Sequence, residues 1–552
     1  MRRQLKILLG RGISPGVASG RAFLCRDVLY EDVEPYNIAR NTSGDEYARV
    51  EQAREQVLQE LDDTAKRVES DLDEERADIF RAQAQILRSP ELMEEIRENL
   101  ERDLTSAGRT VRHVLARFQS HFEQADDPIF RSRVDDIADI TRRLLRVLSG
   151  SPWHSLADLP PETVVVAARL LPSDTITLSR RSTVGVVVER GGPLSHTALL
   201  TRAMGIPAVA EIPDLLKRVP PGALLLIDGL AGKVVFDPDK VELTAFEKRR
   251  HQYQLSVSEM HRRRYEPAQT RDGLIVQVLA NIATQEDAIV AADSGAEGVG
   301  LCRIEGLYLS RQMPPTEEEL TRNLWDVLGP VRHQPVTVRL LDVGGDKRPV
   351  FLDLPAQPDA FLSRRGVRLL LDYPDLLATQ LRVLLRLSQE LELRISIPMV
   401  TLLEEFQQVR QALHTTAKAL GIRAMPPLGV MIETPAAALC AAEFARAADF
   451  VSLGTNDLTQ YTLVAGREEA SVRDCDSEDH PAVQRLIARV VRAAKRSSKP
   501  PILCGELAHR TNRLPWLLQI GIRTLSVAPS LVPSVKASLR SIDLSSYRRS
   551  HR

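Results

Sequence analysis

The chain has 552 residues, 43% of them hydrophobic, which is enough for about two to four domains with apolar cores of their own. Its 73 lysines and arginines nearly balance its 74 aspartates and glutamates, which argues against a nucleic-acid binder with a strongly basic surface. No apolar run is long enough for a membrane span, and five scattered cysteines without CxxC spacing fit a reducing cytoplasm.

The first 150 residues predict a few short strands followed by helices. The strands surround GISPGVASG, and a helical region runs from about Asp45 to Leu148. Its first helix carries one apolar stripe at spacings of three and four: Val50, Ala53, Val57, Leu61, Ala65, Val68 and Leu72. Because Ser89-Pro90 and Asp127-Pro128 interrupt the region, we predict a bundle of three or four helices. A coiled coil is the alternative, but the stripe breaks too often for sustained heptads.

From about Pro160 the pattern changes to that of a compact α/β unit. The β-branched runs ETVVVAARL, TVGVVVERGG and ALLLIDGLAGKVVFD alternate with helical segments. We expect this unit to include the N-terminal strands, so that the helical bundle is an insertion in it. A charged segment from Val241 to Arg264 then predicts a linking helix.

The last 290 or so residues repeat a rhythm of strand, loop and helix. Eight segments read as strands: LIVQVLAN, GVGLC, VTVRLL, RISIPM, LGVMI, FVSLG, PILC and LSVA. Each apart from the last is followed by a segment long enough for a helix. Eight alternating units predict a (β/α)8 barrel of the TIM type.

Several residues with useful chemistry stand where these strands end. They are Arg303, Arg339, Glu433, Asn456, Asp457 and Cys504. Barrel enzymes build their active sites at this face, so we expect these side chains to converge on one mouth. Any one of them alone could be an ordinary surface or core residue. Their shared position at strand ends favours a common site.

The residue types at the mouth indicate an anionic, phosphorylated substrate. Paired arginines such as Arg303 and Arg339 match phosphate and carboxylate groups. Glu433 and Asp457 are oxygen ligands suited to Mg²⁺, whereas the absence of an accompanying histidine disfavours zinc and iron. Cys504 is either an inert buried thiol, the commoner fate of cysteine, or a proton donor at a polar mouth.

A second candidate site is GGPLSHTALL, residues 191–200, which follows the strand that ends at Glu189. Two glycines make a turn, Ser195 is a suitable N-cap, and His196 falls in the first turn of a helix. The free N–H groups there would favour a phosphoryl group on the histidine ring. A lone histidine in a turn is often structural, and both interpretations stay open on this pattern alone.

Six motifs together resemble Enzyme I of the sugar phosphotransferase system. They occur in the family's order along the whole chain and are GGPLSHTALL, GAEGVGL, LLDVGGDK, GVMIETPAAA, GTNDLTQYTL and CGELA. The resemblance implies a phosphoenolpyruvate-protein phosphotransferase of the cytoplasm that transfers phosphoryl to a histidine of its own and then to the HPr carrier protein. It also implies a homodimer formed through the barrel.

The resemblance assigns a role to each part of the chain. Residues 1–30 and 150–238 would form a swivelling phosphohistidine α/β domain, and residues 31–149 an inserted helical domain that binds the carrier. Residues 239–264 would be a linker helix, and residues 265–552 a phosphoenolpyruvate-binding barrel. The boundaries are our expectation for this chain.

The same resemblance assigns roles to individual residues. His196 matches the phosphorylated histidine, and Cys504 the acid that protonates the leaving enolate. Phosphoenolpyruvate would be held by Arg303, Arg339, Arg467, Asn456 and the backbone near Asp457. Glu433 and Asp457 match the magnesium ligands.

The chain departs from the family pattern at a few positions, none of which is a primary catalytic residue. Pro193 stands where arginine is common, and Asp359-Ala360 replaces asparagine-proline. Ser363-Arg364, Ile304 and Gly306 also differ from the usual residues. Nearby, Arg365 and Arg368 are additional candidates for anion contacts.

Three other functions are compatible with parts of this pattern. A pyruvate- or water-dikinase shares the histidine domain and barrel, but it needs an ATP-binding domain, and no GxxxxGK[ST] motif is present. The first component of a nitrogen-type regulatory relay is similar, although such enzymes usually carry an N-terminal sensory domain. A weakly active paralogue that binds an HPr-like partner is the third, and release of pyruvate would distinguish it.

Overall fold

A computed structural model shows two compact units, residues 1–255 and 256–552, each with its own core. The structure describes residues 6–25, 38–39, 42–71, 74–124, 134–150, 156, 159–171, 174, 178, 182–192, 195–309, 311–344, 349, 351–352, 364–465, 478–545 and 547. None of the described helices is long and apolar enough to cross a membrane.

A mixed eight-stranded sheet forms the α/β part of the first unit. Its strands are β1 (Ile7–Leu9), β2 (Arg11–Ser14), β3 (Val17–Cys25), β4 (Thr163–Ala167), β5 (Thr183–Val188), β6 (Ala208–Ala210), β7 (Leu224–Asp228) and β8 (Lys233–Phe236). They lie in the order β1-β8-β7-β3-β4-β5-β6-β2. The sequence did not predict β6, which has only three residues. Helices α8 (His196–Met204) and α9 (Leu215–Arg218) complete this part.

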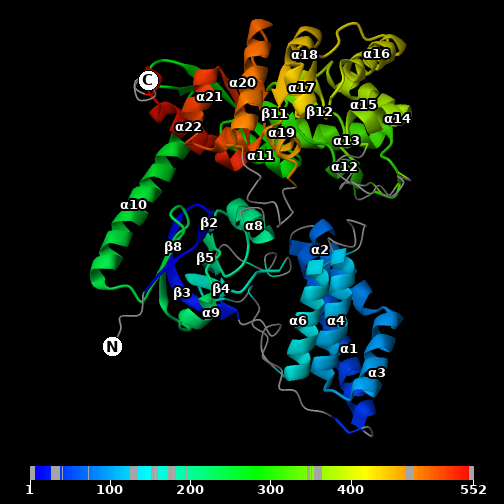
Figure 1. Ribbon diagram of the computed structural model, residues 1–552, viewed down its shortest axis with the longest axis vertical. Helices are drawn as coiled ribbons and strands as arrows, with labels where there is room; N and C mark the ends of the chain where they lie inside the picture. Colours follow the sequence, from blue (N-terminus) through cyan, green and yellow to red (C-terminus); the bar gives the residue numbers. More distant parts are fainter. Residues whose placement is uncertain are drawn as a thin grey trace. The chain divides into compact units, whose positions relative to one another are not determined.

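The helical bundle is an insertion in that sheet, as predicted. The chain leaves at the end of β3 and returns in β4, which pairs with β3 in parallel from Arg21↔Thr163 to Cys25↔Ala167. Five helices of the bundle are described: α1 (Ser43–Asp71), α2 (Glu74–Leu87), α3 (Pro90–Asp103), α4 (Ala107–Gln124) and α6 (Val134–Ser149). They pack side by side in Figure 1. The expectation of three or four was therefore too low.

The expected apolar stripe of α1 forms the centre of this bundle. Its first five residues, Val50 to Ala65, are buried in one cluster with apolar side chains of the other four helices. The side chains of Val68 and Leu72 lie outside the described residues, as does Asp127-Pro128. Ser89-Pro90 separates α2 from α3, where Ser89 caps the new helix by accepting a hydrogen bond from the Leu92 N–H.

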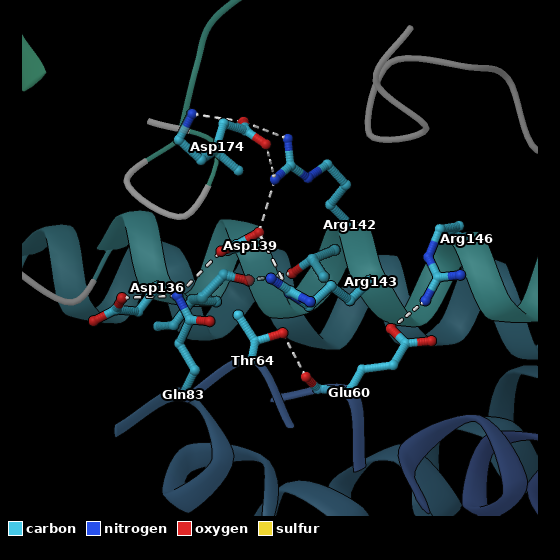
Figure 2. Close-up of polar contacts among 12 residues, drawn as sticks. Glu60, Thr64, Gln83, Asp136, Asp139, Arg142, Arg143, Arg146 and Asp174 are labelled. Carbon is cyan, nitrogen blue, oxygen red and sulfur yellow. Dashed lines mark hydrogen bonds and ion pairs between the residues drawn. The ribbon is translucent and has the colours of Figure 1, made fainter. Parts of the chain in front are cut away.

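A buried polar network joins two bundle helices to the segment that follows β4 (Figure 2). Gln83 of α2 donates to Asp136 and to Asp139 of α6, at 3.1 Å each. Arg142 donates to Asp139 at 2.9 Å and holds both oxygens of Asp174, at 2.7 and 2.8 Å. Such a bidentate pair is directional, so it fixes α6 against this segment of the α/β part.

The second unit is a closed barrel of eight parallel strands, as predicted. They are β10 (Ile275–Ile282), β11 (Val299–Cys302), β12 (Val336–Arg339), β13 (Leu393–Ile397), β14 (Leu428–Ile432), β15 (Val451–Leu453), β16 (Ile502–Leu503) and β17 (Thr524–Val527). Each pairs in parallel with the next, and β10 pairs with both β11 and β17, which closes the ring. A short β9 (Ala268–Gln269) pairs antiparallel with β10.

Helices alternate with these strands (Figure 1). They are α11 (Gln285–Asp293), α12 (Gly306–Leu309), α13 (Glu317–Leu328), α14 (Val367–Asp372), α15 (Pro374–Leu387), α16 (Leu403–Ala419), α17 (Pro435–Leu439), α18 (Ala441–Ala447), α19 (Thr455–Leu463), α20 (Pro481–Arg496), α21 (Leu514–Ile520) and α22 (Val532–Ser541). Short 3₁₀ turns occur at η3 (Gly329–Val331), η5 (Glu506–His509) and η6 (Pro529–Leu531). The eighth strand is also followed by a helix, α22, which the sequence reading omitted.

The barrel interior is filled by a small apolar cluster. Its members are Leu279, Leu301, Met431, Phe450, Ile502 and Cys504. Their neighbours on the same strands, such as Val278 and Val430, pack in the larger cluster with the surrounding helices. This alternation places the small cluster inside the ring and Cys504 at its upper end. The linking helix α10 (Lys240–Arg262) has no buried residue, and the boundary between the units falls within it.

Candidate active site

The carboxyl ends of the barrel strands carry the residues that the sequence selected. Arg303 follows β11, Arg339 is the last residue of β12, and Glu433 follows β14. Asn456 and Asp457 lie in the first turn of α19 after β15, and Cys504 follows β16. Because the strands are parallel and the ring is closed, these positions share one rim.

Arg339 is the centre of a buried ion-pair network at this rim. Its guanidinium lies 2.7 Å from Glu305 and 3.4 Å from Asp342. Asp342 also accepts from Arg365 at 2.8 Å, and Arg365 lies 3.8 Å from Asp457. Opposite charges therefore alternate from Glu305 to Asp457, and each charge has a neighbour of opposite sign.

The network keeps its arginines charged. Burial alone would lower the pKa of Arg339, but the carboxylates of Glu305, Asp342 and Glu433 outweigh it and raise that pKa. The pKa of Arg365 is raised in the same way, since Asp342 more than offsets burial. A buried arginine held by carboxylates is a fixed positive charge, which is what an anionic ligand requires.

Arg303 differs from Arg339 because it retains a large exposed surface at the mouth. Neighbouring protein atoms displace part of the water around its guanidinium and so lower its pKa, and the nearby positive charge of Arg339 lowers that pKa further. An anion bound between the two guanidinium groups would offset the repulsion between their positive charges. This electrostatic arrangement fits the predicted phosphate or carboxylate contact.

Glu433 is a buried carboxylate that the backbone holds in place. Its Oε1 accepts a hydrogen bond from the Met399 N–H at 2.7 Å. The backbone of Met399 has a left-handed φ of +55°. Gly454 leaves room for it, since a Cβ there would lie 2.7 Å from Oε2. Burial, together with the charge of Asp457, raises the pKa of Glu433 to about 8. A cation bound beside Glu433 and Asp457 would stabilise the negative charges of both carboxylates.

The donor set fits Mg²⁺ better than a metal that needs a full protein cage. Within the described ranges no group of three histidine, cysteine, aspartate or glutamate side chains could hold a metal ion. Glu433 and Asp457 supply two hard oxygen ligands, which matches the way Mg²⁺ keeps waters and substrate oxygens in its shell. These two carboxylates are the residues that would hold it.

Cys504 is a buried, protonated thiol beside the charged groups. Its side chain is 4% exposed, and its Sγ lies 3.7 Å from the Gly300 carbonyl oxygen and 3.8 Å from that of Ile502. Burial raises its pKa to about 12, against the opposing effect of Arg303. A thiol with this pKa is a poor nucleophile at neutral pH but retains a proton to give.

The remaining candidates at the mouth have different outcomes. Asn456 Oδ1 accepts from the Glu506 N–H at 2.8 Å, so its amide oxygen already fixes the turn after Cys504. Arg368 donates to Glu405 at 2.6 Å instead of joining the network. Arg467, Asp359, Ala360 and Ser363 lie outside the described residues.

The second candidate site has the predicted backbone. Ser195 is the N-cap of α8, accepting from the Ala198 N–H at 3.3 Å, and His196 is the first helical residue. Ser195 also donates to the Gly192 carbonyl at 2.8 Å, and Gly191 has a φ of +134° that favours glycine. The His196 side chain and Pro193 lie outside the described part of the chain.

Sequence reasoning missed the carboxylates Glu305 and Asp342, and it gave Arg365 little weight. Asp342 interrupts the apolar run LLDV, and a charge in such a run is a signal for a buried ion pair. Glu305 had no comparable signal, because its partner Arg339 comes from the next strand.

Models of the PEP-utilising enzymes match three parts of the chain. The PEP-binding domain matches residues 257–544, the N-terminal domain residues 9–133, and the mobile domain residues 159–232.

Relatives named phosphoenolpyruvate-protein phosphotransferase cover nearly the whole chain. The protein of Bacillus sp. (strain S) is 36% identical over 502 residues, which are 90% of this chain and 87% of its own length. That of Listeria monocytogenes is 35% identical, covering 98% of this chain and 95% of its own length. The Bacillus subtilis protein is 33% identical, covering 96% and 93% respectively.

Proposed function

We propose a reaction path from one premise: the chain belongs to the phosphoenolpyruvate-protein phosphotransferase family and is a transferase of that kind. The observation that carries the path is the barrel mouth. There, fixed arginine charges, the carboxylates of Glu433 and Asp457, and a protonated thiol are electrostatic neighbours.

In this proposal, Arg303, Arg339 and Arg467 bind the phosphate and carboxylate of phosphoenolpyruvate. Asn456 and the first turn of α19 complete the anion site. Charge spreads over the phosphate oxygens in a loose transition state, so arginines already in place stabilise it without reorganising. Mg²⁺, held by Glu433 and Asp457, supplies further positive charge when it is bound.

His196 is the proposed acceptor. Its ring nitrogen forms the N–P bond as the bond between phosphorus and the enolate oxygen breaks. The enolate then takes a proton at its methylene carbon from the Cys504 thiol, and pyruvate results. This path requires the α/β domain to swivel so that His196 reaches the barrel mouth.

Phosphohistidine is then proposed to pass its phosphoryl group to a histidine of an HPr-like carrier docked on the helical insert. The domain limits expected from the sequence, residues 31–149 for the docking domain and 265–552 for the barrel, follow this division of labour. We propose that the enzyme acts in the cytoplasm as a homodimer formed through the barrel. Sugar uptake is the proposed downstream pathway.

A rapid-quench measurement of pyruvate tests this path. Mixing the enzyme with phosphoenolpyruvate and Mg²⁺ should release about one pyruvate per active site, because His196 is then occupied. Adding a carrier protein of the HPr type should turn this burst into continuous turnover, and removing Mg²⁺ should suppress both. A protein that binds the carrier but releases no pyruvate would support the weakly active paralogue instead.

A further inference from the structure

A further buried carboxylate, Glu478, has no part in the reaction path above. It lies three residues before the start of α20. Its side chain is 7% exposed, and burial raises its pKa. One oxygen accepts from the Thr455 hydroxyl at 2.7 Å, and the other lies 3.3 Å from the Arg510 guanidinium.

Thr455 connects Glu478 to the residues that would bind substrate and metal. It is fully buried and is the first residue of α19, directly before Asn456 and Asp457. Thr455 also touches the turn after the thiol, because a Cβ on Gly505 would lie 1.8 Å from its hydroxyl oxygen. Only glycine can therefore stand beside Cys504 while Thr455 keeps its position.

Arg510 connects the same carboxylate to the far end of the turn that follows the thiol. It follows η5, the 3₁₀ turn that begins just after Cys504 and Gly505. The turn is held from two directions: the Glu506 N–H donates to Asn456, and Arg510 is paired with Glu478. Glu478 thus bridges the helix that carries Asp457 and the turn that follows the proton donor.

An adjacent ion pair joins the same two segments. Asp479 lies 2.6 Å from Arg513, beside the Glu478–Arg510 pair. Glu478 differs from Asp479 in accepting a hydrogen bond from Thr455, the residue directly before Asn456 and Asp457. If Glu478 did no more than attach one segment to the other, removing the Asp479–Arg513 pair should have the same effect as removing the Glu478–Arg510 pair.

We propose that Glu478 is a positioning residue for the protonation of enolpyruvate. Through Thr455 and Arg510 it sets the place of the Cys504 thiol relative to the substrate bound at α19. The inference rests on the proposed function, since it needs Cys504 as the proton donor. Misplacing a catalytic group by about 1 Å can cost roughly 100-fold in rate, whereas substrate affinity depends on other contacts.

Glu478→Gln tests the proposal, with Thr455→Val as a second variant that keeps every charge. For both we expect kcat for pyruvate formation to fall about 10- to 100-fold, with KM for phosphoenolpyruvate little changed. The solvent isotope effect on kcat should rise above the wild-type value, because proton transfer becomes slower. Asp479→Asn and Arg513→Gln are the matched controls and should retain wild-type kcat and isotope effect.

The outcomes separate the inference from the function it rests on. Wild-type enzyme without a pyruvate burst would remove the proposed function itself. An active wild type with kcat unchanged in folded Thr455→Val and Glu478→Gln would overturn the inference alone. Equal losses in the Asp479 and Arg513 controls would also overturn it, because they would reveal attachment of the segment as the cause.

Discussion

Replacing Arg339 should harm both the stability and the chemistry of this enzyme, and a second substitution separates the two effects. Arg339 is 5% exposed and pairs with Glu305 at 2.7 Å and Asp342 at 3.4 Å. Arg339→Gln leaves Glu305 without this cation, and breaking a buried pair costs about 3–5 kcal/mol. Loss of an arginine charge at a phosphoryl transition state should lower the rate by about 10³- to 10⁵-fold.

The double variant Arg339→Gln/Glu305→Gln removes both charges of the pair. We expect it to recover much of the lost stability, because Asp342 still has Arg365 at 2.8 Å. It should recover none of the activity, because the anion site still lacks its charge. Calorimetric melting and a lactate dehydrogenase-coupled pyruvate assay measure the two quantities. If activity returned together with stability, the role of Arg339 would be structural and the reasoning wrong.

Three further predictions concern other parts of the molecule. Cys504→Ala should slow pyruvate formation more than back-transfer from phosphorylated carrier to His196; equal losses, measured by rapid quench, would count against the proton donor. The pKa of Glu433 is raised to about 8, so without divalent cations stability falls as pH rises from about 4.5 through 8. The melting temperature of Glu433→Gln should therefore exceed that of the wild type at pH 9 but not at pH 4. An equal difference in melting temperature at the two pH values would contradict this. Asp139→Ala should destabilise the first unit by about 3–5 kcal/mol, because fully buried Asp139 pairs with Arg142. A free energy of unfolding in urea within about 1 kcal/mol of the wild-type value would refute this prediction.

The barrel could be predicted because its strands are apolar runs in the sequence, and nearly all of them are followed by a segment long enough for a helix. LGVMI, for example, is a continuous apolar run, and all five of its residues are buried as β14. The residue after each strand then projects to the rim, so strand ends alone selected Arg303, Glu433 and Cys504. Local order along the chain was sufficient for this part of the site.

Other features depend on contacts between distant segments and left no local pattern. The strand β6 is a short AVA that forms by pairing with β2 and β5. Helix α22 was missed because a proline and three serines weaken its helical pattern. Glu478 contacts Thr455 and Arg510, which come from separate connections of the barrel. No spacing rule brings such residues together, since only the closed ring does so.

The central claim is that His196 receives the phosphoryl group of phosphoenolpyruvate. Its most direct test is incubation of the enzyme with labelled phosphoenolpyruvate and Mg²⁺, followed by mass spectrometry under conditions that preserve acid-labile phosphohistidine. We predict label on the peptide that contains His196 and its loss in His196→Ala. A folded enzyme that releases pyruvate with no label on His196, or with label that survives in His196→Ala, would contradict the account.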